Sequence, residues 1–429
     1  MGTPSTGWWT VTTLDDLERW GEAFSAFHAR FADLFARRES REQMAKYLRG
    51  LLAPVERKNS WQVAEAVGDA TPDRMQRLLY RVDWDVDAAR DRLQAFVRET
   101  FGDPEGIGVL DETGFLKKGT ASVGVQRQRW GTAGKVENCQ IGVFLSYATP
   151  RGHVLLDRRL YLPEAWCEDP ARRARAKVPE EVGFQTKPEL AIAMLEHAWA
   201  QGVPMRWVTG DEVYGDAPRL RETIERHGRG YVLTVSSTTP VWTERPPVGS
   251  PSERAPMGSP VVGPSREPGD RPRTRARRAS GAPPATTVGA VVAGWPAEAW
   301  QRLAVAEGEQ GLRVSDWGRA RVIEQRDRLP GPEVWLLARR SLSDPDDLAY
   351  YLALAPTEVS LQELATVAAT RSTAEQCLEE AKRKTGLDQY EVRHWPSWYR
   401  HITLSMLAHA WLAAIRSQAE VRQGGVLPA

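Results

Sequence analysis

Two aspartates end apolar runs that are predicted to be buried strands. Asp111 lies in "GIGVLDETGF" and Asp211 in "MRWVTGDEVYG". A single buried aspartate is most often a structural hydrogen-bond acceptor, because a buried charge needs a partner. Two of them on core strands of one sheet also suit hard divalent cations, which prefer carboxylate oxygens. A pair of such ions about 3.5–4 Å apart stabilises both the attacking and the leaving oxygen in phosphodiester cleavage.

This chemistry usually needs a third carboxylate, and "ATRSTAEQCLEEAKRKTG" offers two candidates. Arg371 and Glu375 are four residues apart and so share a helix face. Lys382 lies two turns beyond Glu375, nearly in line with it. An acid between two cations is suited to hold a metal while the cations bind phosphates; the alternative is a solvated helix with ordinary ion pairs. Glu379 lies on the same stripe, so spacing alone leaves the choice between the two glutamates open.

Other residues near these segments are candidates for contacts with DNA. Lys117 and Lys118 follow the first aspartate and form either an exposed turn or a phosphate clamp. Tyr214 either stacks on a base or is an ordinary core or surface tyrosine. Arg393 and Arg400 lie among aromatic residues in "EVRHWPSWYRHI", a mixture that suits single-stranded or distorted DNA but also a packed aromatic core. Glu112, beside Asp111, is interpreted as a solvated neighbour, with support of a metal ligand as the alternative.

The elements that must position these residues fall into three regions. Residues 1–100 are predicted to be helical, because apolar residues recur every three or four positions. Within them, "SWQVAEAVGDATPDRMQRLLYRV" is typical of a DNA-reading helix-turn-helix, although a plain helical bundle has the same pattern. Residues 101–240 change to three strands followed by strand–helix units, which indicates a mixed-sheet α/β domain. Residues 346–429 complete this domain and are predicted to be helical from Leu348 to the end.

Residues 241–345 are predicted to be an insertion into this domain. The first part, about 243–285, is rich in Pro, Gly, Ser and Arg, so it is expected to be a disordered linker. β-like runs follow, so the second part is predicted to be β-rich. The linker carries a basic cluster made of Arg271, Arg273, Arg275, Arg277 and Arg278.

Composition restricts the class of protein. The chain has 429 residues, of which 41% are hydrophobic and 26% charged, as in soluble globular proteins with more than one structural unit. A net charge of +1 means that any basic surface must be local. No apolar run is long enough to span a membrane. Only three cysteines occur, without metal-ligand spacing, which fits a reducing cytoplasm.

The motifs resemble those of a known family. Asp111 in "VLDETGFLKKG", Asp211 in "WVTGDEVYGD" and Glu375 in "RSTAEQCLEEAK" resemble the triad of the DDE transposases, which have an RNase H-like fold. The last segment is similar to a signature of that group, Arg, three residues, Glu, six residues, Lys, and this similarity selects Glu375 over Glu379. The segments "GTAGKVENCQIGVF" and "GLDQYEVRHWPSWYRHITLSMLAHAWL" resemble one bacterial insertion-sequence family, whose pattern also includes an insertion before the Glu-bearing helix.

The resemblance implies an RNase H-like mixed sheet flanked by helices, an N-terminal helical domain and a β-rich insertion. It implies a bacterial, cytoplasmic transposase, associated with the nucleoid when bound to DNA. With Mg²⁺, or Mn²⁺ in its place, such an enzyme cuts double-stranded DNA at terminal inverted repeats and joins the ends to target DNA as a homodimer. The residues expected to contact DNA are Lys117, Lys118, Tyr214, Arg371, Lys382, Arg393 and Arg400.

Three positions depart from the family's pattern. Ala368, Ser372 and Ala374 stand where an aromatic, a bulky and an aliphatic residue are expected, so the wall beside the catalytic helix is smaller. This difference keeps two alternatives open. One is a domesticated transposase that binds DNA without cutting it, and the other is a host nuclease that cuts DNA without transposition.

Overall fold

The computed structural model describes residues 14–130, 135–249, 277–278, 283–306 and 312–422. The chain forms two compact units. Unit 1 contains residues 1–207 and 370–429, and unit 2 contains residues 208–369. Most of the predicted linker, with the first three arginines of its basic cluster, lies outside the described residues.

The N-terminal part of unit 1 is helical, as predicted. Asn59 caps the third helix by accepting hydrogen bonds from the backbone N–H groups of Trp61 and Gln62. Gly68, with φ of 77°, makes the turn between the third and fourth helices. Whether this pair reads DNA stays a prediction. The helices are α1 (Leu14–Ala29), η1 (Ala32–Leu34), α2 (Arg38–Leu52), α3 (Ser60–Ala66), α4 (Asp73–Tyr80) and α5 (Val86–Phe101).

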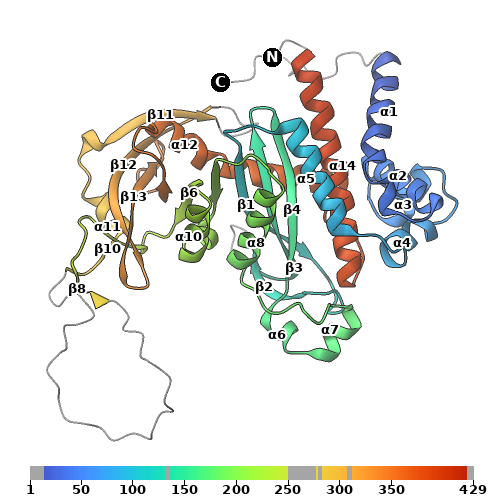
Figure 1. Ribbon diagram of the computed structural model, residues 1–429, viewed down its shortest axis with the longest axis horizontal. Coiled ribbons are helices and arrows are strands. Elements are labelled where there is room, and N and C mark those ends of the chain that lie inside the picture. Colours follow the sequence, from blue (N-terminus) through green and yellow to red (C-terminus); the bar gives the residue numbers. More distant parts are fainter. Residues whose placement is uncertain (1–13, 131–134, 250–276, 279–282, 307–311, 423–429) are drawn as a thin grey trace, which may run out of the picture. The chain divides into compact units, whose positions relative to one another are not determined.

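Four antiparallel strands form the sheet of unit 1 (Figure 1). β3 (Lys135–Thr149) pairs along one edge with β1 (Ile107–Leu116), and Asp111 lies opposite Phe144. Its other edge pairs first with β2 (Gln126–Trp130) and then with β4 (Gly152–Tyr161). Long apolar runs with β-branched and aromatic residues explain why β1, β3 and β4 are largely buried strands, whereas β2, with the sequence QRQRW, is polar and more exposed.

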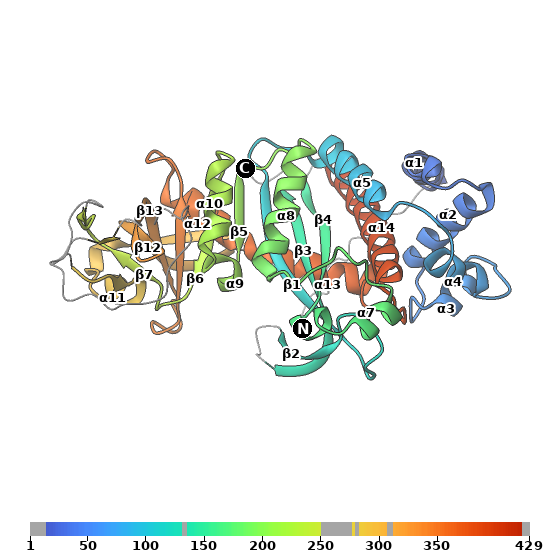
Figure 2. The ribbon, with the colours of Figure 1, turned by 60° about the horizontal axis from the view of Figure 1, so that its bottom comes forward.

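Helices cover both faces of this sheet. In Figure 2, α8 (Lys187–Ala200) lies in front of the strands and α13 (Arg371–Thr385) passes behind them. α8 packs on β3 and β4, whereas α13 packs on β1, β3 and β4. α14 (Trp395–Arg422) packs on β4, α5 and α13. Two short helices, α6 (Glu164–Cys167) and α7 (Pro170–Ala176), connect β4 to α8.

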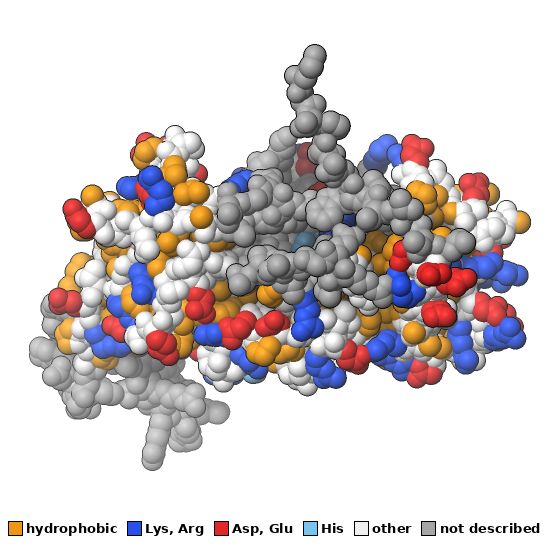
Figure 3. Space-filling view, turned by 90° about the horizontal axis from the view of Figure 1, so that it is seen from above, with side chains coloured by type: hydrophobic (Ala, Val, Ile, Leu, Met, Phe, Trp, Pro, Cys, Tyr) orange, Lys and Arg blue, Asp and Glu red, His pale blue; other side chains and the backbone are white. Residues whose placement is uncertain are grey.

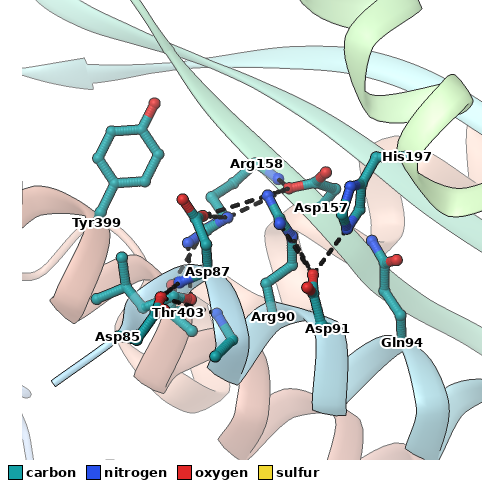
Figure 4. A network of polar contacts seen from close by, with 12 residues as sticks. Asp85, Asp87, Arg90, Asp91, Gln94, Asp157, Arg158, His197, Tyr399 and Thr403 are labelled. Atoms are coloured by element: carbon teal, nitrogen blue, oxygen red, sulfur yellow. Dashed lines mark hydrogen bonds and ion pairs between the residues drawn. The ribbon is translucent and has the colours of Figure 1, made fainter. Parts of the chain in front are cut away.

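A buried polar network ties β4 to the helices around it (Figure 4). Arg158 on β4 is fully buried, and its guanidinium donates to Asp87 of α5 at 3.1 Å and to Thr403 of α14 at 3.0 Å. Asp91 of α5 lies 2.7 Å from Nε2 of His197 on α8. Such charge-assisted bonds fix geometry, so four elements of unit 1 hold one another in register.

Unit 2 contains a second set of strands, in the order β10-β7-β12-β13-β14-β6, with β11 paired to β12. Its helices are α9 (Glu212–Gly215), α10 (Pro218–Arg226), α11 (Val288–Ala293), η2 (Ala297–Ala299) and α12 (Leu361–Ala369). β5 (Trp207–Gly210) leads into the unit. The remaining strands are β6 (Gly230–Val235), β7 (Pro240–Trp242), β8 (Val248–Gly249), β9 (Arg277–Arg278), β10 (Thr286–Thr287), β11 (Trp300–Ala306), β12 (Leu312–Arg326), β13 (Leu329–Arg340) and β14 (Leu348–Leu354).

One predicted helical segment is wrong. Residues 348–354, "LAYYLAL", form strand β14, which pairs antiparallel with β13 on one side and β6 on the other. A short apolar run does not distinguish a buried strand from a buried helix, and the partner strands decide. Arg277 and Arg278, predicted to be disordered, pair with β8.

The mixed α/β class, the N-terminal helices and the β-rich second part of the insertion are confirmed. The predicted domain boundaries at 241 and 345 stay predictions; the two compact units are defined by contacts and meet at 207/208 and 369/370. Among the residues described, none of the helices combines the length and the hydropathy that crossing a bilayer requires.

Candidate active site

Asp111 lies on the face of β1 that is turned toward α13. Val109, two residues earlier, is fully buried and packs with Ala148 of β3 and Ala374 of α13. Side chains two apart on a strand share a face, and β1 pairs with β3 without a register shift. The half-buried Asp111 therefore points to the side of α13. Its Oδ1 accepts a hydrogen bond of 2.8 Å from the backbone N–H of Glu112.

Glu112 points to the opposite face of the same strand. Its carboxylate forms an ion pair with Lys187, at the start of α8, and its side chain is largely buried. The interpretation of Glu112 as a solvated neighbour is wrong, because the alternation of β1 turns it toward α8 rather than toward water. Glu112 also lies on the other side of the sheet from Asp111, so the two adjacent carboxylates have separate environments.

Glu375 extends from α13 directly after the buried Ala374. Its side chain is 50% exposed, and Oε1 lies 3.5 Å from Nη2 of Arg371. The predicted shared face of Arg371 and Glu375 is confirmed. Because Ala374 contacts Val109, the packing of α13 on β1 brings the segments that carry Asp111 and Glu375 together. Ser372 is half-buried on the same helix.

Glu379 behaves as an ordinary surface residue. Its side chain is 73% exposed, and Lys382 donates to it at 3.1 Å. In this structure Lys382 is paired with Glu379 and not with Glu375, although its spacing places it on the same stripe.

Glu380, which the sequence did not single out, is the buried carboxylate of α13. Its side chain is only 9% exposed and accepts hydrogen bonds from Lys384 at 2.9 Å and from Arg416 of α14 at 3.1 Å. His409 of α14 and His153 of β4 lie 3.7 and 3.9 Å away. Burial alone raises the pKa of Glu380, but the bonds to His409 and Lys384 and the charge of Arg416 outweigh it and hold the pKa well below its usual range.

Asp211 directly follows the fully buried strand β5 and belongs to unit 2. It is half-buried, and its Oδ1 accepts a hydrogen bond of 3.0 Å from the backbone N–H of Val213, which caps the short helix α9. Tyr214, in the same helix, is fully buried. Its ring has the core position that was one of the alternatives, so it does not present a surface to DNA here.

Ala368 is likewise buried, on α12 of unit 2.

The donor set of the proposed triad suits a hard cation. Asp111, Asp211 and Glu375 offer carboxylate oxygens only, which matches Mg²⁺ or Mn²⁺ rather than the nitrogen and sulfur ligands of zinc. Within the described part of the chain, no three His, Cys, Asp or Glu side chains form a cluster that would hold a metal ion. The triad therefore stays a prediction, supported in unit 1 by the packing of β1 against α13.

The structure brings together three of the cations that were expected to contact DNA. Lys117, Lys118 and Arg393 line one cavity of about 790 Å³. Nζ of Lys117 lies 3.7 Å from the centroid of the Tyr390 ring and donates to the Tyr390 carbonyl at 3.2 Å. Burial lowers the pKa of Lys117 to about 8. Arg400 does not line this cavity; it donates to a backbone carbonyl of α4 at 3.0 Å, and burial lowers its pKa.

Comparison with known proteins places the chain in a family. The model of the DDE superfamily endonuclease matches residues 30–312, a range that includes Asp111 and Asp211 and ends before Glu375. The probable transposase for insertion sequence element IS701 from Microchaete diplosiphon is 26% identical over 200 residues, which are 45% of this chain and 48% of that protein. The chain thus spans about half the length of this curated relative.

Among solved structures, the piggyBac transposase in a synaptic complex with hairpin DNA is similar with a TM-score of 0.42 and 10% identity. The match covers 96% of this chain and 77% of that one. The family model covers more than half of the 429 residues, and so the chain belongs to the DDE superfamily endonuclease family.

Proposed function

We propose that this endonuclease is a transposase that cuts DNA at the ends of a mobile element and joins those ends to target DNA. The observation that supports the proposal is the packing of Ala374 on Val109, because Ala374 precedes Glu375 on α13 and Val109 shares a face of β1 with Asp111. The similarity to a probable insertion-sequence transposase supports the same reaction class.

In this proposal Asp111, Asp211 and Glu375 hold divalent cations, with Mg²⁺ as the physiological ion and Mn²⁺ as a substitute. Bound there, such ions activate water and stabilise the charge that develops on the leaving oxygen. In the same proposal Arg371, whose Nη2 lies 3.5 Å from Oε1 of Glu375, binds a phosphate oxygen next to the scissile bond. The rigid strand β1 supplies a fixed position for Asp111, which is what precise cleavage requires.

DNA contacts in this protein are proposed to be local. Where side chains are coloured in Figure 3, basic and acidic groups of the described residues are interspersed. The net charge of +1 agrees with this mixture. Lys117, Lys118 and Arg393, which meet at one cavity, are the cations that we assign to DNA phosphates. The terminal inverted repeats and the homodimer on DNA belong to the proposal as family analogies.

The small side chain of Ala374 is compatible with the proposed catalytic site. Its side chain is fully buried between Val109 and Ala148. A small residue there lets the helix approach the strand closely, which serves the position of Glu375 rather than removing it.

The deciding experiment compares two adjacent carboxylates. The purified chain is incubated with DNA that carries the element's own ends, with Mg²⁺ or Mn²⁺, and nicks, hairpins and joined products are scored. Asp111→Asn should abolish cleavage and leave end binding nearly intact, because an amide keeps the shape and loses the charge. Glu112→Gln, which changes the opposite face of β1, should still cleave. Cleavage by Asp111→Asn within about threefold of the unaltered chain would exclude the metal-ligand role.

A further inference from the structure

Two cavities of unit 1 adjoin each other beside α3 and α4, because they share part of their lining. The larger, of about 790 Å³, lies between Arg57, the turn after β1 and residues 388–393. The smaller, of about 540 Å³, is lined by α3, α4 and the same 388–393 segment. They share the lining residues Asn59, Gln389, Tyr390, Glu391 and Arg393. We call this the α3–α4 groove; each half has the volume of an ordinary ligand site, roughly 300–1,000 Å³.

The smaller half presents aromatic rings to solvent. Trp61 on α3 is 59% exposed, and Tyr80 at the end of α4 is also exposed. Asn59 caps α3 by accepting from the backbone N–H of Trp61 at 3.0 Å, so the ring extends from a fixed first turn. The Tyr80 ring meets His394 edge-to-face, with centroids 5.8 Å apart. Both rings are exposed, and the Trp61 side chain extends from a capped helix start, where it is available to a partner.

Cations border the rings along the groove. Arg57, Lys118 and Arg393 are exposed, and the Lys117 ammonium forms part of the wall over Tyr390. Acidic residues are also present in the lining, namely Glu56, Asp388 and Glu391. Stacking rings between exposed cations are the recognition chemistry for single-stranded nucleic acid, whose bases offer their faces and whose phosphates offer charge. A paired duplex hides those base faces, so an intact double helix does not use the rings.

We propose that the α3–α4 groove binds a short unpaired stretch of DNA. Bases stack on Trp61 and Tyr80, while Arg57, Lys118 and Arg393 contact the phosphates. The inference rests on the proposed function in one respect, that DNA is the substrate and is opened near the cut. In this proposal the helices before β1 bind the opened strand, in addition to any contact that they make with duplex DNA.

The test measures binding of a labelled oligothymidine of about ten nucleotides, a length within the usual site sizes of roughly 4–16, and of a blunt duplex of equal length. Fluorescence anisotropy of the label gives both affinities. Trp61→Ala should weaken single-strand binding about tenfold and duplex binding by less than about twofold. Trp61→Phe should restore most of the loss, because a ring is retained. Phe184→Ala is the matched control, since Phe184 is 42% exposed in the same unit and does not line the groove.

Three outcomes overturn the proposal: an unaltered chain that does not bind the oligothymidine, a Trp61→Ala variant that binds it normally, and equal losses on single strand and duplex. Tyr80→Ala provides an independent variant and should also weaken single-strand binding selectively. The Asp111→Asn variant separates this idea from the proposed function. If that variant still cleaves, the catalytic proposal fails; if it binds the oligothymidine as the unaltered chain does while Trp61→Ala does not, the groove stands.

Discussion

The two faces of α13 place the same kind of residue in opposite environments. On the outer face Glu375 and Glu379 are 50% and 73% exposed, whereas on the inner face Glu380 is 9% exposed. Glu375 and Glu380 are five residues apart, which turns them about 140° around the helix axis. One helix thus carries an accessible acid suited to a metal and an enclosed acid that holds the helix in place.

The surroundings of the two carboxylates distinguish a reactive acid from a structural one. Glu380 is paired with Lys384 of α13 and Arg416 of α14, so its charge is neutralised within the fold, and His409 of α14 and His153 of β4 lie beside it. Glu375 has Arg371 at 3.5 Å and retains access to solvent, so a cation and a phosphate can reach it. Substitutions at three glutamates of this helix test whether the accessible acid is catalytic and the enclosed acid structural.

The largest effect is expected on activity at Glu375. Glu375→Gln should lower the cleavage rate by about a thousandfold or more, because a neutral amide is a poor ligand for Mg²⁺ or Mn²⁺. Its thermal unfolding should be nearly unchanged, since the side chain is half exposed. Cleavage assays across a range of Mn²⁺ concentrations measure the loss. An active Glu375→Gln beside an inactive Glu379→Gln would transfer the role to the other glutamate.

The second effect is expected on stability at Glu380. Glu380→Gln should lower the free energy of unfolding by about 2–3 kcal/mol, because Lys384, Arg416 and the two histidines lose a charged partner. Urea unfolding at neutral pH measures this loss. A difference below about 0.5 kcal/mol would show that the half-exposed Lys384 and Arg416 rehydrate without penalty.

The same substitution has a defined pH dependence. The pKa of Glu380 in the folded chain lies below its ordinary value of 4.5, so folded chains release this proton more readily than unfolded ones. Its contribution is fully present above pH 4.5 and is lost as the pH falls through the lower, folded pKa. The stability gap between the unaltered chain and Glu380→Gln should therefore be constant from pH 7 to 5 and shrink below 4.5.

The smallest effect is expected at Glu379. Glu379→Gln removes a surface pair with Lys382, which is worth at most about 1 kcal/mol. Stability should fall by less than that, and cleavage should stay within about twofold of the unaltered chain. Calorimetric unfolding and the same cleavage assay check both. A large loss of activity here would contradict the assignment of Glu375, rather than Glu379, as the metal ligand.

The charged stripe of α13 could be predicted from the local sequence alone. The positions of Arg371, Glu375, Glu379 and Lys382 on one stripe follow from helix periodicity, and the structure confirms their pairing at four and three residues. The burial of Glu380 did not follow, because its partners come from β4 and from α14. Contacts between distant segments depend on the tertiary fold, so the spacing of residues within one helix does not predict them.

Strand β1 gives a similar result. Alternation alone places Asp111 and Glu112 on opposite faces, but only the packing of α8 and α13 shows that Glu112 is paired with Lys187. Trp61 was not singled out from the sequence, although Asn59 is a typical N-cap residue and a ring in the first helical turn, outside the apolar stripe, is a detectable signal. Strand β14 was missed because its identity depends on strands β6 and β13, which lie elsewhere in the chain.

The pairing of β6 with β14 has a consequence for the time course of synthesis. Val235 on β6 pairs with Tyr350 on β14, which is 115 positions later in the chain (350 minus 235). At ribosomal rates of roughly 5–20 residues per second, β14 emerges roughly 6 to 23 seconds after β6. During that interval this edge of β6 lacks its final partner, and an open strand edge is a template for unwanted association. The long segment between β6 and β14 therefore delays their pairing. During this delay the open edge of β6 depends on a chaperone or the ribosome surface for protection against association with other chains.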